Sequence, residues 1–264
     1  MIVINDSDDT RIELYRHLHG TPVSHTESGV FIAEGAKTTR ALLKSKLEIV
    51  SIFALPEFYE EYSELINRRS LRSEQLFTAD KAVMNEIVGF RLHEGIMAIG
   101  IQPESVPIEE VAFPAVALSG IVNSENVGAI IRNCAAFGVK SVIVDATTSS
   151  PYLRRSVRVS MGAVFNINIH YVKNIHQALF SLRKDKTVSI ISAELTEDSK
   201  DIQDFAFTKK SVIVFGSEGK GIAPDLLAEC DHVISISINP EIDSLNVAAA
   251  SGIVLYELSK RKSG

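Results

Sequence analysis

Cysteine is scarce in this chain of 264 residues, which contains only Cys134 and Cys230. The two lie far apart in the sequence, without the short spacing that ligands of a structural metal site usually show. Both are surrounded by apolar, helix-forming residues. Since such cysteines are usually buried free thiols, we expect neither a disulfide nor a bound metal ion.

Long hydrophobic runs are missing as well. No apolar segment reaches the roughly 18 residues that a membrane-spanning helix needs. The first six residues carry no basic group before their short apolar patch, which argues against a secretory signal. The sequence shows no internal repeat and no low-complexity segment. Together with the cysteine pattern, these absences predict a cytoplasmic protein that does not associate with membranes.

The chain also lacks an excess of positive charge, because 27 basic residues stand against 33 acidic ones and the net charge is −6. This balance argues against binding to nucleic acid through a global field, but it leaves room for a local basic groove. Solvated helix faces are the alternative explanation for each basic cluster. Three such clusters occur: Arg68, Arg69 and Arg72; Arg154, Arg155 and Arg158; and Lys260, Arg261 and Lys262.

The composition is otherwise that of an ordinary globular protein, with 45% hydrophobic and 23% charged residues. The length permits two moderate domains.

In the first hundred residues, short apolar segments alternate with helical patterns, which predicts a small α/β domain over residues 1–101. We expect strands at 30–33, 49–55, 74–78 and 95–100, and helices at 36–46, 56–67 and 79–88. Three prolines and three glutamates between 102 and 114 predict a linker over 102–113.

The second half, residues 114–264, alternates more strongly apolar segments with helical ones. Because strands that read as continuous apolar runs are typical of parallel sheets covered on both faces, we expect such a sheet here. Ligands of these sheets bind at the carboxyl ends of the strands. The expected strands are 116–118, 141–144, 167–171, 187–192, 212–215 and 233–238.

A first polar patch follows the strand at 116–118 and opens a helix. Asn126 lies near the start of that helix, and Arg132 follows six residues later, which we interpret as roughly the same side. An arginine is unusual within this otherwise apolar helix. The simpler explanation is that Asn126 caps the helix and that Arg132 extends its charged end to a carboxylate.

A second patch, Gly-Ser-Glu-Gly-Lys-Gly at residues 216–221, follows the strand at 212–215. Its spacing matches neither the phosphate-binding P-loop nor the dinucleotide fingerprint. Three glycines allow a backbone to approach a ligand closely, although many glycine turns are only turns. Glu218 is poorly placed for a phosphate, and it suits a ligand with hydroxyl groups or a positive charge better.

A third patch, Ser244-Leu245-Asn246, precedes a small-residue helix at the end of the sequence. Ser244 could be the N-cap of that helix. Asn246 would then lie within the first turn, where capping does not explain it. The run of alanines at 248–250 and Gly252 permits close helix packing, either at an interface between two copies or within one chain.

The three patches together resemble the motifs of the SpoU branch of the SPOUT RNA methyltransferases: Asn-x-Gly…Arg, Gly-x-Glu-Gly-x-Gly and Ser-Leu-Asn-Val before a final helix. The resemblance extends from Ala115 to the C-terminus, and residues 156–162 match a further stretch between the motifs. The first half is similar, through residues 31–35 and the helix after them, to the ribosomal-protein-like RNA-binding domain that often precedes the SPOUT domain.

This resemblance implies an α/β fold with a C-terminal SPOUT domain that contains a trefoil knot and packs as a homodimer. It also implies transfer of a methyl group from S-adenosylmethionine to a ribose 2′-hydroxyl of RNA. The separate first domain favours rRNA over tRNA by analogy. The implied cofactor-binding residues are Thr196, Gly216, Ser217, Glu218, Gly219, Ile236, Ile238, Leu245 and Asn246. The implied catalytic residues are Arg132, Asn126, Glu218, Ser244 and Asn246. Candidates for the RNA path are Arg154, Arg155 and Arg158.

The resemblance gives Arg132 the role of the catalytic arginine. Because a guanidinium hardly ever deprotonates, electrostatic stabilisation of the reacting oxygen is the alternative to a role as base. The chain departs from the family at residues 236–238, Ile-Ser-Ile instead of Ile-Pro-Met, and in the acidic stretch 239–243. These departures leave open a non-enzymatic RNA-binding protein. A nucleotide-dependent dehydrogenase is disfavoured, because neither half has a glycine fingerprint after its first strand.

Overall fold

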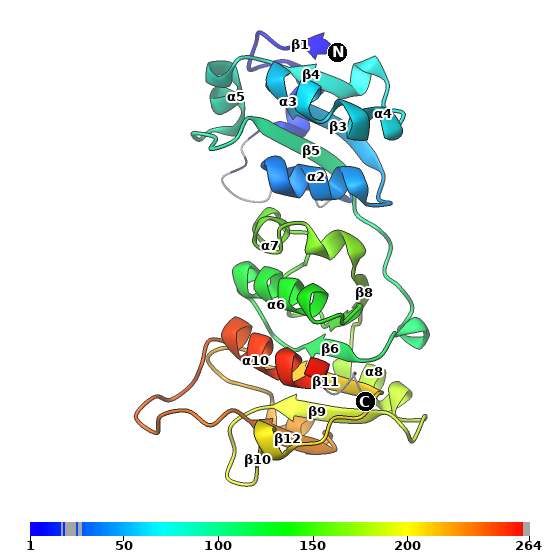
Figure 1. Ribbon diagram of the computed structural model, residues 1–264, viewed down its shortest axis with the longest axis vertical. Helices are drawn as coiled ribbons and strands as arrows, with labels where there is room; N and C mark the ends of the chain where they lie inside the picture. The colour runs from blue at the N-terminus through cyan, green and yellow to red at the C-terminus, as the bar shows by residue number, and fades with distance from the viewer. Residues whose placement is uncertain (17, 19–24, 26–27, 261–264) are drawn as a thin grey trace. The chain divides into compact units, whose positions relative to one another are not determined.

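The computed structural model describes residues 1–16, 18, 25 and 28–260. The chain forms two compact units, each built around one sheet (Figure 1). The first unit contains Met1–Pro103 and Tyr152–Phe165, and the second contains Glu104–Pro151 and Asn166–Gly264.

The sheet of the first unit is mixed, with the strand order β1-β4-β3-β5-β2. Strands β1, β4 and β3 run parallel, and β5 pairs antiparallel with β3 and with β2. The predicted α/β character of this half is therefore confirmed. Its strands are β1 (Ile2–Val3), β2 (Val30–Glu34), β3 (Ile49–Ala54), β4 (Leu76–Thr78) and β5 (Ile96–Ile101).

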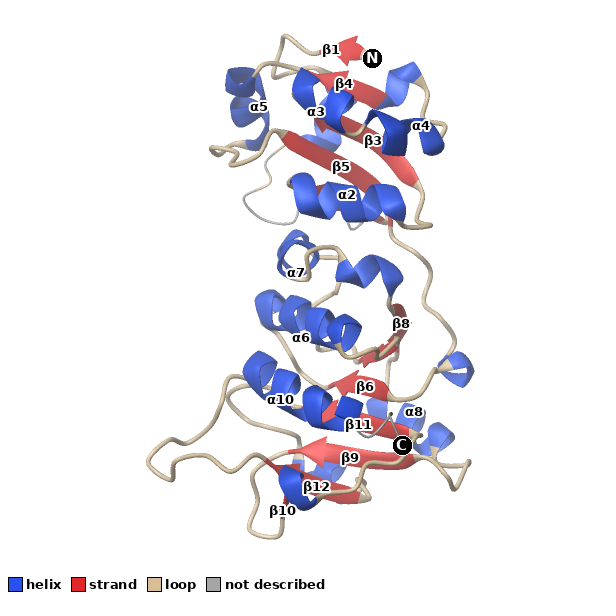
Figure 2. Cartoon of the chain, in the orientation of Figure 1, coloured by secondary structure: helices blue, strands red, loops and turns tan. Residues whose placement is uncertain are grey.

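Short helices accompany this sheet, and their ends follow local chemistry (Figure 2). The helix expected over 56–67 is divided, because Tyr62 leaves helical geometry at φ −105° and ψ 15°. The Asp80 carboxylate accepts from the backbone N–H of Val83, and Gly89, at φ 83°, ends the same helix. The helices among the described residues are α2 (Ala36–Lys44), α3 (Pro56–Glu61), α4 (Ser63–Arg68) and α5 (Lys81–Val88), with 3-10 turns η1 (Thr10–Tyr15) and η2 (Ser73–Gln75).

The first unit also includes a segment from the middle of the second half of the sequence. Helix α7 (Arg154–Val159) packs against β2. The Phe31 ring lies 5.1 Å from the ring of Phe165 and 5.4 Å from that of Tyr152, measured between centroids. Gly162, at φ 76°, approaches α2 so closely that an added Cβ would lie 2.6 Å from the Cβ of Ala41. Segment 152–165 is therefore part of the hydrophobic core of this unit.

The sheet of the second unit is entirely parallel, as the sequence predicts. Its strand order is β10-β12-β9-β11-β6-β7-β8, so each strand between the two edge strands has a hydrogen-bonded neighbour on either side. Its strands are β6 (Ala115–Leu118), β7 (Ser141–Val144), β8 (Asn168–Tyr171), β9 (Ser189–Ala193), β10 (Lys200–Asp201), β11 (Ser211–Phe215) and β12 (His232–Ser235). Strand order does not specify how loops thread through one another. The trefoil knot expected for this half therefore remains a prediction.

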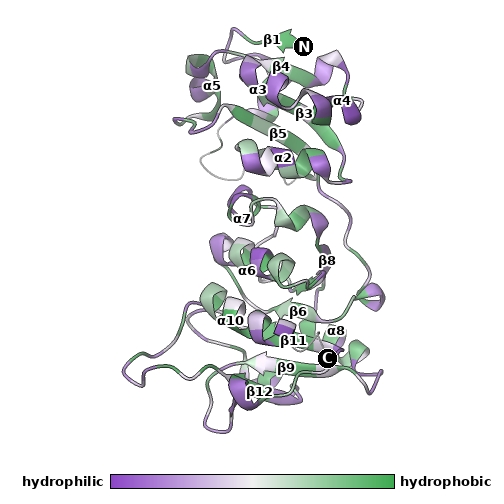
Figure 3. Cartoon of the chain, viewed as in Figure 1, coloured by the Kyte–Doolittle hydropathy of each residue, from purple (hydrophilic) through white to green (hydrophobic). Residues whose placement is uncertain are grey.

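Helices bury the apolar strands, which are coloured hydrophobic in Figure 3. Side chains of α8 (Ile175–Leu182) and α9 (Pro224–Ala228) form one core cluster with alternate residues of β6 and β11. Helices α6 (Ser124–Ala136) and α10 (Val247–Lys260) lie side by side over the sheet (Figure 1). The described residues also form the 3-10 turns η3 (Ile108–Glu110) and η5 (Ile202–Asp204) in this unit, and η4 (Ala163–Asn166) where the chain passes back from the first unit.

The small residues of α10 serve packing within the chain. The side-chain amide of Asn133 on α6 donates to the carbonyl of Ala248 and to Oγ of Ser251, each at 2.9 Å. A Cβ added to Gly252 would lie 3.4 Å from the same amide. The sequence left open whether these residues pack inside the chain or at an interface, and the structure places them against α6.

Both cysteines are free thiols, as expected. Cys134 is buried, and burial raises its pKa. Cys230 is partly buried, and burial raises its pKa to about 11. None of the helices within the described residues is both long enough and apolar enough to span a membrane.

Candidate active site

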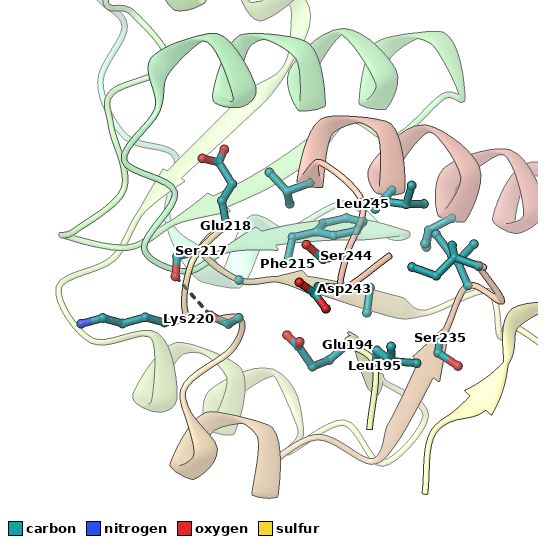
Figure 4. Close-up of a pocket in the computed structure, with 18 of the residues that line it drawn as sticks. Glu194, Leu195, Phe215, Ser217, Glu218, Lys220, Ser235, Asp243, Ser244 and Leu245 are labelled. Atoms are coloured by element: carbon teal, nitrogen blue, oxygen red, sulfur yellow. Dashed lines mark hydrogen bonds between the residues drawn. The ribbon is translucent and has the colours of Figure 1, made fainter. Parts of the chain in front are cut away.

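A pocket of about 370 Å³ opens at the carboxyl ends of three neighbouring strands, β9, β11 and β12, and at the start of α10 (Figure 4). This is where the sequence places a ligand, since parallel sheets bind ligands at that edge. Its polar lining includes Glu194, Ser217, Glu218, Lys220, Asp243 and Ser244, and its apolar lining includes Leu195, Phe215, Ile236, Ile238, Leu245 and Val254.

The glycine loop after β11 forms a tight turn at one wall of the pocket. Backbone N–H groups of Ser217 and Gly221 donate to each other's carbonyls, at 3.0 and 2.9 Å. A Cβ on Gly216 would lie 2.3 Å from the carbonyl carbon of Gly221, so this position accommodates only glycine. Gly221 has φ 64°, whereas Gly219 has open space around it. Two of the three glycines are therefore required by the turn itself.

Glu194 is a lining residue that the sequence motifs did not reveal. It directly follows β9, and its Oε2 accepts from the backbone N–H of Ile222 at 2.9 Å. A carboxylate at the carboxyl end of an apolar strand was the available signal. Thr196, the candidate proposed instead, is not among the lining residues, and its carbonyl accepts from Oγ of Ser199 at 2.7 Å.

The third patch forms the opposite wall and the start of α10. Ser244 and Leu245 line the pocket. The alternative explanation, that Ser244 caps α10, is wrong, because the helix begins at Val247 and Asn246 directly precedes it. The side-chain Oδ1 of Asn246 accepts from the N–H groups of Ala248 and Ala249, at 2.9 and 3.3 Å, which is the bonding pattern of an N-cap.

The first patch meets the third through a pair of asparagines. The side-chain amide of Asn246 donates to Oδ1 of Asn126 over 3.2 Å. Asn126 does not cap α6, because Oδ1 of Asn123 accepts from the N–H of Glu125 and fills that position. Asn126 is buried, with 8% of its surface exposed. Its side chain therefore joins the starts of two helices.

Arg132 lies on a different side of α6 from Asn126, and the expectation of a shared side is wrong. Six residues turn an α-helix by about 600°, which leaves the two side chains roughly 120° apart. Arg132 is exposed and outside the pocket lining. Within the described part of the chain, its guanidinium has no hydrogen-bond or ion-pair partner.

The departure at residues 236–238 has a structural role. Strand β12 ends at Ser235 rather than at the expected residue 238, and the chain then turns along the pocket, where Ile236 and Ile238 line it. The hydroxyl of Ser237 donates to the Asp201 carboxylate at the end of β10, and this hydrogen bond lowers the pKa of Asp201. A proline at position 237 could not make this contact.

The three arginines proposed for RNA differ in their surroundings. Nε and Nη2 of Arg154 each lie 2.7 Å from Oε2 of Glu34, and its guanidinium stacks 4.6 Å from the centre of the Phe90 ring. With its side chain 18% exposed, Arg154 belongs to the core contacts of the first unit. Arg155 and Arg158 are exposed, and Arg158 reaches Glu34 only at 4.0 Å.

Comparison with known proteins gives a consistent result. Residues 114–256 match the SpoU rRNA Methylase family. The 23S rRNA (guanosine-2′-O-)-methyltransferase RlmB of Acinetobacter baylyi is 27% identical over 195 residues, which cover 70% of this chain and 78% of that protein. An uncharacterized tRNA/rRNA methyltransferase of Mycobacterium tuberculosis is 27% identical over 263 residues, covering 97% and 90%.

Solved structures share the fold over both units. The SpoU methyltransferase AviRb of Streptomyces viridochromogenes, in complex with AdoMet, has a TM-score of 0.82 at 23% identity and covers 97% of this chain and 100% of its own. The AdoMet-bound rRNA methyltransferase of Sinorhizobium meliloti has a TM-score of 0.80 at 22% identity, covering 99% and 98%. Because the family match spans more than half of the sequence and contains all three motifs, this chain belongs to the SpoU rRNA methylase family.

Proposed function

We propose that this protein transfers a methyl group from S-adenosylmethionine to a ribose 2′-hydroxyl of ribosomal RNA. One observation carries the proposal: the second and third sequence motifs form opposite walls of one pocket, and the first motif contacts the third through Asn126 and Asn246. Membership of the SpoU family and the similarity to RlmB support the reaction and the class of RNA.

The residues of the pocket fit S-adenosylmethionine. Its volume lies within the range of about 300–1,000 Å³ that is usual for small-molecule sites. Leu195, Ile238 and Leu245 offer apolar surface for an adenine ring. Hydroxyl and carboxylate groups, among them Ser217 and Glu194, offer partners for a ribose and an amino group. Thr196 stays a more distant candidate at the adenosine end.

The chemistry requires orientation more than activation by the protein. S-adenosylmethionine supplies a methyl group already activated by its positively charged sulfur. With this donor bound, the ribose oxygen would have to lie in line with the methyl group and the sulfur, and the hydroxyl proton would have to leave to a base or to water. The chain must hold the ribose in line and stabilise the developing negative charge on its oxygen. We assign these tasks to the supporting residues Asn126, Glu218, Ser244 and Asn246 and to Arg132.

Arg132 suits the role of an electrostatic stabiliser. Its guanidinium is exposed and without a partner in the described residues, so it is available to an RNA phosphate, although it lies outside the lining of the pocket. Arg155 and Arg158 are the remaining surface candidates for the RNA path, because Arg154 is held by Glu34.

A cytoplasmic location stays a prediction from the cysteine pattern.

We also propose that two copies associate through the second unit. On α10, Ile253 is 40% exposed and Tyr256 is 50% exposed, so the helix keeps an apolar side after it has packed against α6. Exposed large apolar side chains that lie together on one face mark interaction surfaces, and Ile253 and Tyr256 are three residues apart on this helix. Sedimentation velocity of the wild type and of Tyr256→Glu would test this, with a dimer expected only for the wild type.

The proposed function is tested by methyl transfer with labelled S-adenosylmethionine. We expect label in rRNA and none in tRNA, and we expect alkaline-resistant linkages at the modified nucleotide, since a 2′-O-methyl group blocks cleavage there. Arg132→Ala should lose transfer while it retains cofactor binding by calorimetry and wild-type circular dichroism. Label in tRNA alone would show that the substrate is tRNA rather than rRNA. Absence of cofactor binding in calorimetry would favour a non-enzymatic RNA-binding protein.

A further inference from the structure

The pocket carries an excess of negative charge. Three carboxylates, those of Glu194, Glu218 and Asp243, line it, and among the described lining residues Lys220 is the only one with a cationic side chain. In Figure 4 the carboxylates of Glu194 and Asp243 point into the pocket, whereas the side chains of Glu218 and Lys220 extend away from it. The Lys220 ammonium group therefore does not neutralise the carboxylates that face the interior of the pocket.

Glu194 is held in place rather than free to turn outward. Its Oε2 accepts from the backbone N–H of Ile222, and the left-handed Gly221 lies directly against the carboxylate, since a Cβ there would approach Oε2 to 2.6 Å. A carboxylate accepts several hydrogen bonds, so the second oxygen remains available to a ligand. No ion pair in the described part of the chain involves either Glu194 or Asp243.

Two carboxylates that face one cavity without a cation repel each other, and a positively charged ligand removes this repulsion. The cofactor of the proposed function carries a sulfonium, an ammonium and one carboxylate, so its net charge is positive. Its demethylated product has lost the sulfonium charge and is neutral overall. The two molecules share all other groups, and an electronegative pocket can therefore separate them by charge.

We propose that Glu194 and Asp243 make this pocket selective for the charged sulfonium, so that it holds S-adenosylmethionine more tightly than S-adenosylhomocysteine. This inference rests on the proposed function and adds the residues that set the preference. Release of the neutral product is then favoured after each transfer. The acidic stretch 239–243, which departs from the family pattern, gains a role, because its last residue is Asp243.

Calorimetry on the full chain tests the proposal without a turnover reaction. The probes are S-adenosylmethionine, S-adenosylhomocysteine and sinefungin, which carries an amine in place of the methylated sulfur. We expect the wild type to bind the two cationic probes about tenfold more tightly than the neutral one at low salt. The preference should shrink as added salt screens the carboxylates.

Glu194→Gln and Asp243→Asn should each reduce this preference severalfold, mainly through weaker binding of the cationic probes. Both changes keep the shape of the side chain, and the amide oxygen introduced by Glu194→Gln could still accept from the N–H of Ile222. Glu241→Gln is the matched control, because Glu241 belongs to the same loop but does not line the pocket. An unchanged preference in both variants, with all probes still bound, would overturn the charge selectivity alone. A wild type that binds none of the probes would overturn the proposed function.

Discussion

The side-chain amide of Asn246 donates a hydrogen bond to Oδ1 of Asn126 across 3.2 Å, and so links two positions that are 120 residues apart in the sequence. The same Asn246 side chain uses its oxygen to cap α10. One residue therefore orients the final helix and fixes the start of α6. Asn246 is therefore a capping residue, and because it is not among the residues that line the pocket, its role in the site stays a prediction.

We expect Asn246→Ala to lower the free energy of unfolding by about 1–2 kcal/mol, because it removes the cap and leaves Asn126 without its partner. Asn246→Asp should lose less, because a carboxylate still caps the helix. Urea denaturation measures both. Ser244→Ala is the control and should change stability by less than about 0.5 kcal/mol. An equal loss for Ser244→Ala would return the capping role to Ser244.

Gly221→Ala should weaken cofactor binding and lower stability by about 1–2 kcal/mol, the cost of a left-handed conformation for a residue with a side chain. The new methyl group would also displace the Glu194 carboxylate. Calorimetry and thermal denaturation report the two effects. Gly219→Ala is the matched control in the same loop, because nothing lies within 4 Å of its added Cβ. Similar losses in both variants would contradict this account of the turn.

Arg154→Ala should destabilise the protein by about 3 kcal/mol, the lower end of the range for breaking a buried ion pair, because Glu34 would keep only the longer contact with Arg158, at 4.0 Å. Glu34 is 9% exposed and Arg154 18%. Arg158→Ala should leave stability within about 0.5 kcal/mol and reduce the salt dependence of RNA binding. Denaturation curves and RNA titrations at several salt concentrations separate the two residues. If Arg154→Ala only weakened RNA binding, its structural role would be refuted.

His170 should make the protein less stable in mild acid. Its Nδ1–H donates to the carbonyls of Val106 and Pro107, and its Nε2 accepts from Ser141. Burial lowers the pKa of His170, so the unfolded chain binds a proton more readily than the folded one. Stability is therefore fully present above the unfolded pKa of about 6.5 and declines as the pH falls below it.

Denaturation of the wild type and of His170→Asn between pH 5 and 8 measures this effect. The variant should lose stability less steeply below pH 6.5, although a slope should remain because burial also lowers the pKa of His25. His93→Asn, at an exposed histidine, serves as control and should keep the wild-type profile. Identical profiles for His170→Asn and the wild type would rule out His170 as the origin.

Local patterns were sufficient for most elements, because each strand of a parallel sheet is a short apolar run and because Pro56 and Gly89 mark helix ends. The motifs also located the pocket, since residues 216–221 and 244–245 lie in its wall. The failures concern features that depend on distant contacts. Helix α10 begins two residues later than capping by Ser244 would require, so Asn246 is the cap instead. Arg132, six residues after Asn126, lies on a different side of α6 rather than on the same side.

Other features had a weak local signal or none. Glu194 is a single carboxylate after a strand, and only the fold brings it beneath Gly221. Arg154 looked like one member of a surface cluster, because the sequence does not show that Glu34 lies 2.7 Å away. In each case the decisive partner is far along the chain, where periodicity carries no information.

The two units cannot be separated by one cut. The chain passes from one to the other at residues 103–104, 151–152 and 165–166. A fragment that starts at residue 104 would keep segment 152–165 but lose Phe31, so that the apolar rings of Tyr152 and Phe165 would face water. Such a fragment should aggregate unless those rings are replaced. The first unit is thus not a continuous segment that can be exchanged by itself. An exchange of this unit between relatives must include segment 152–165.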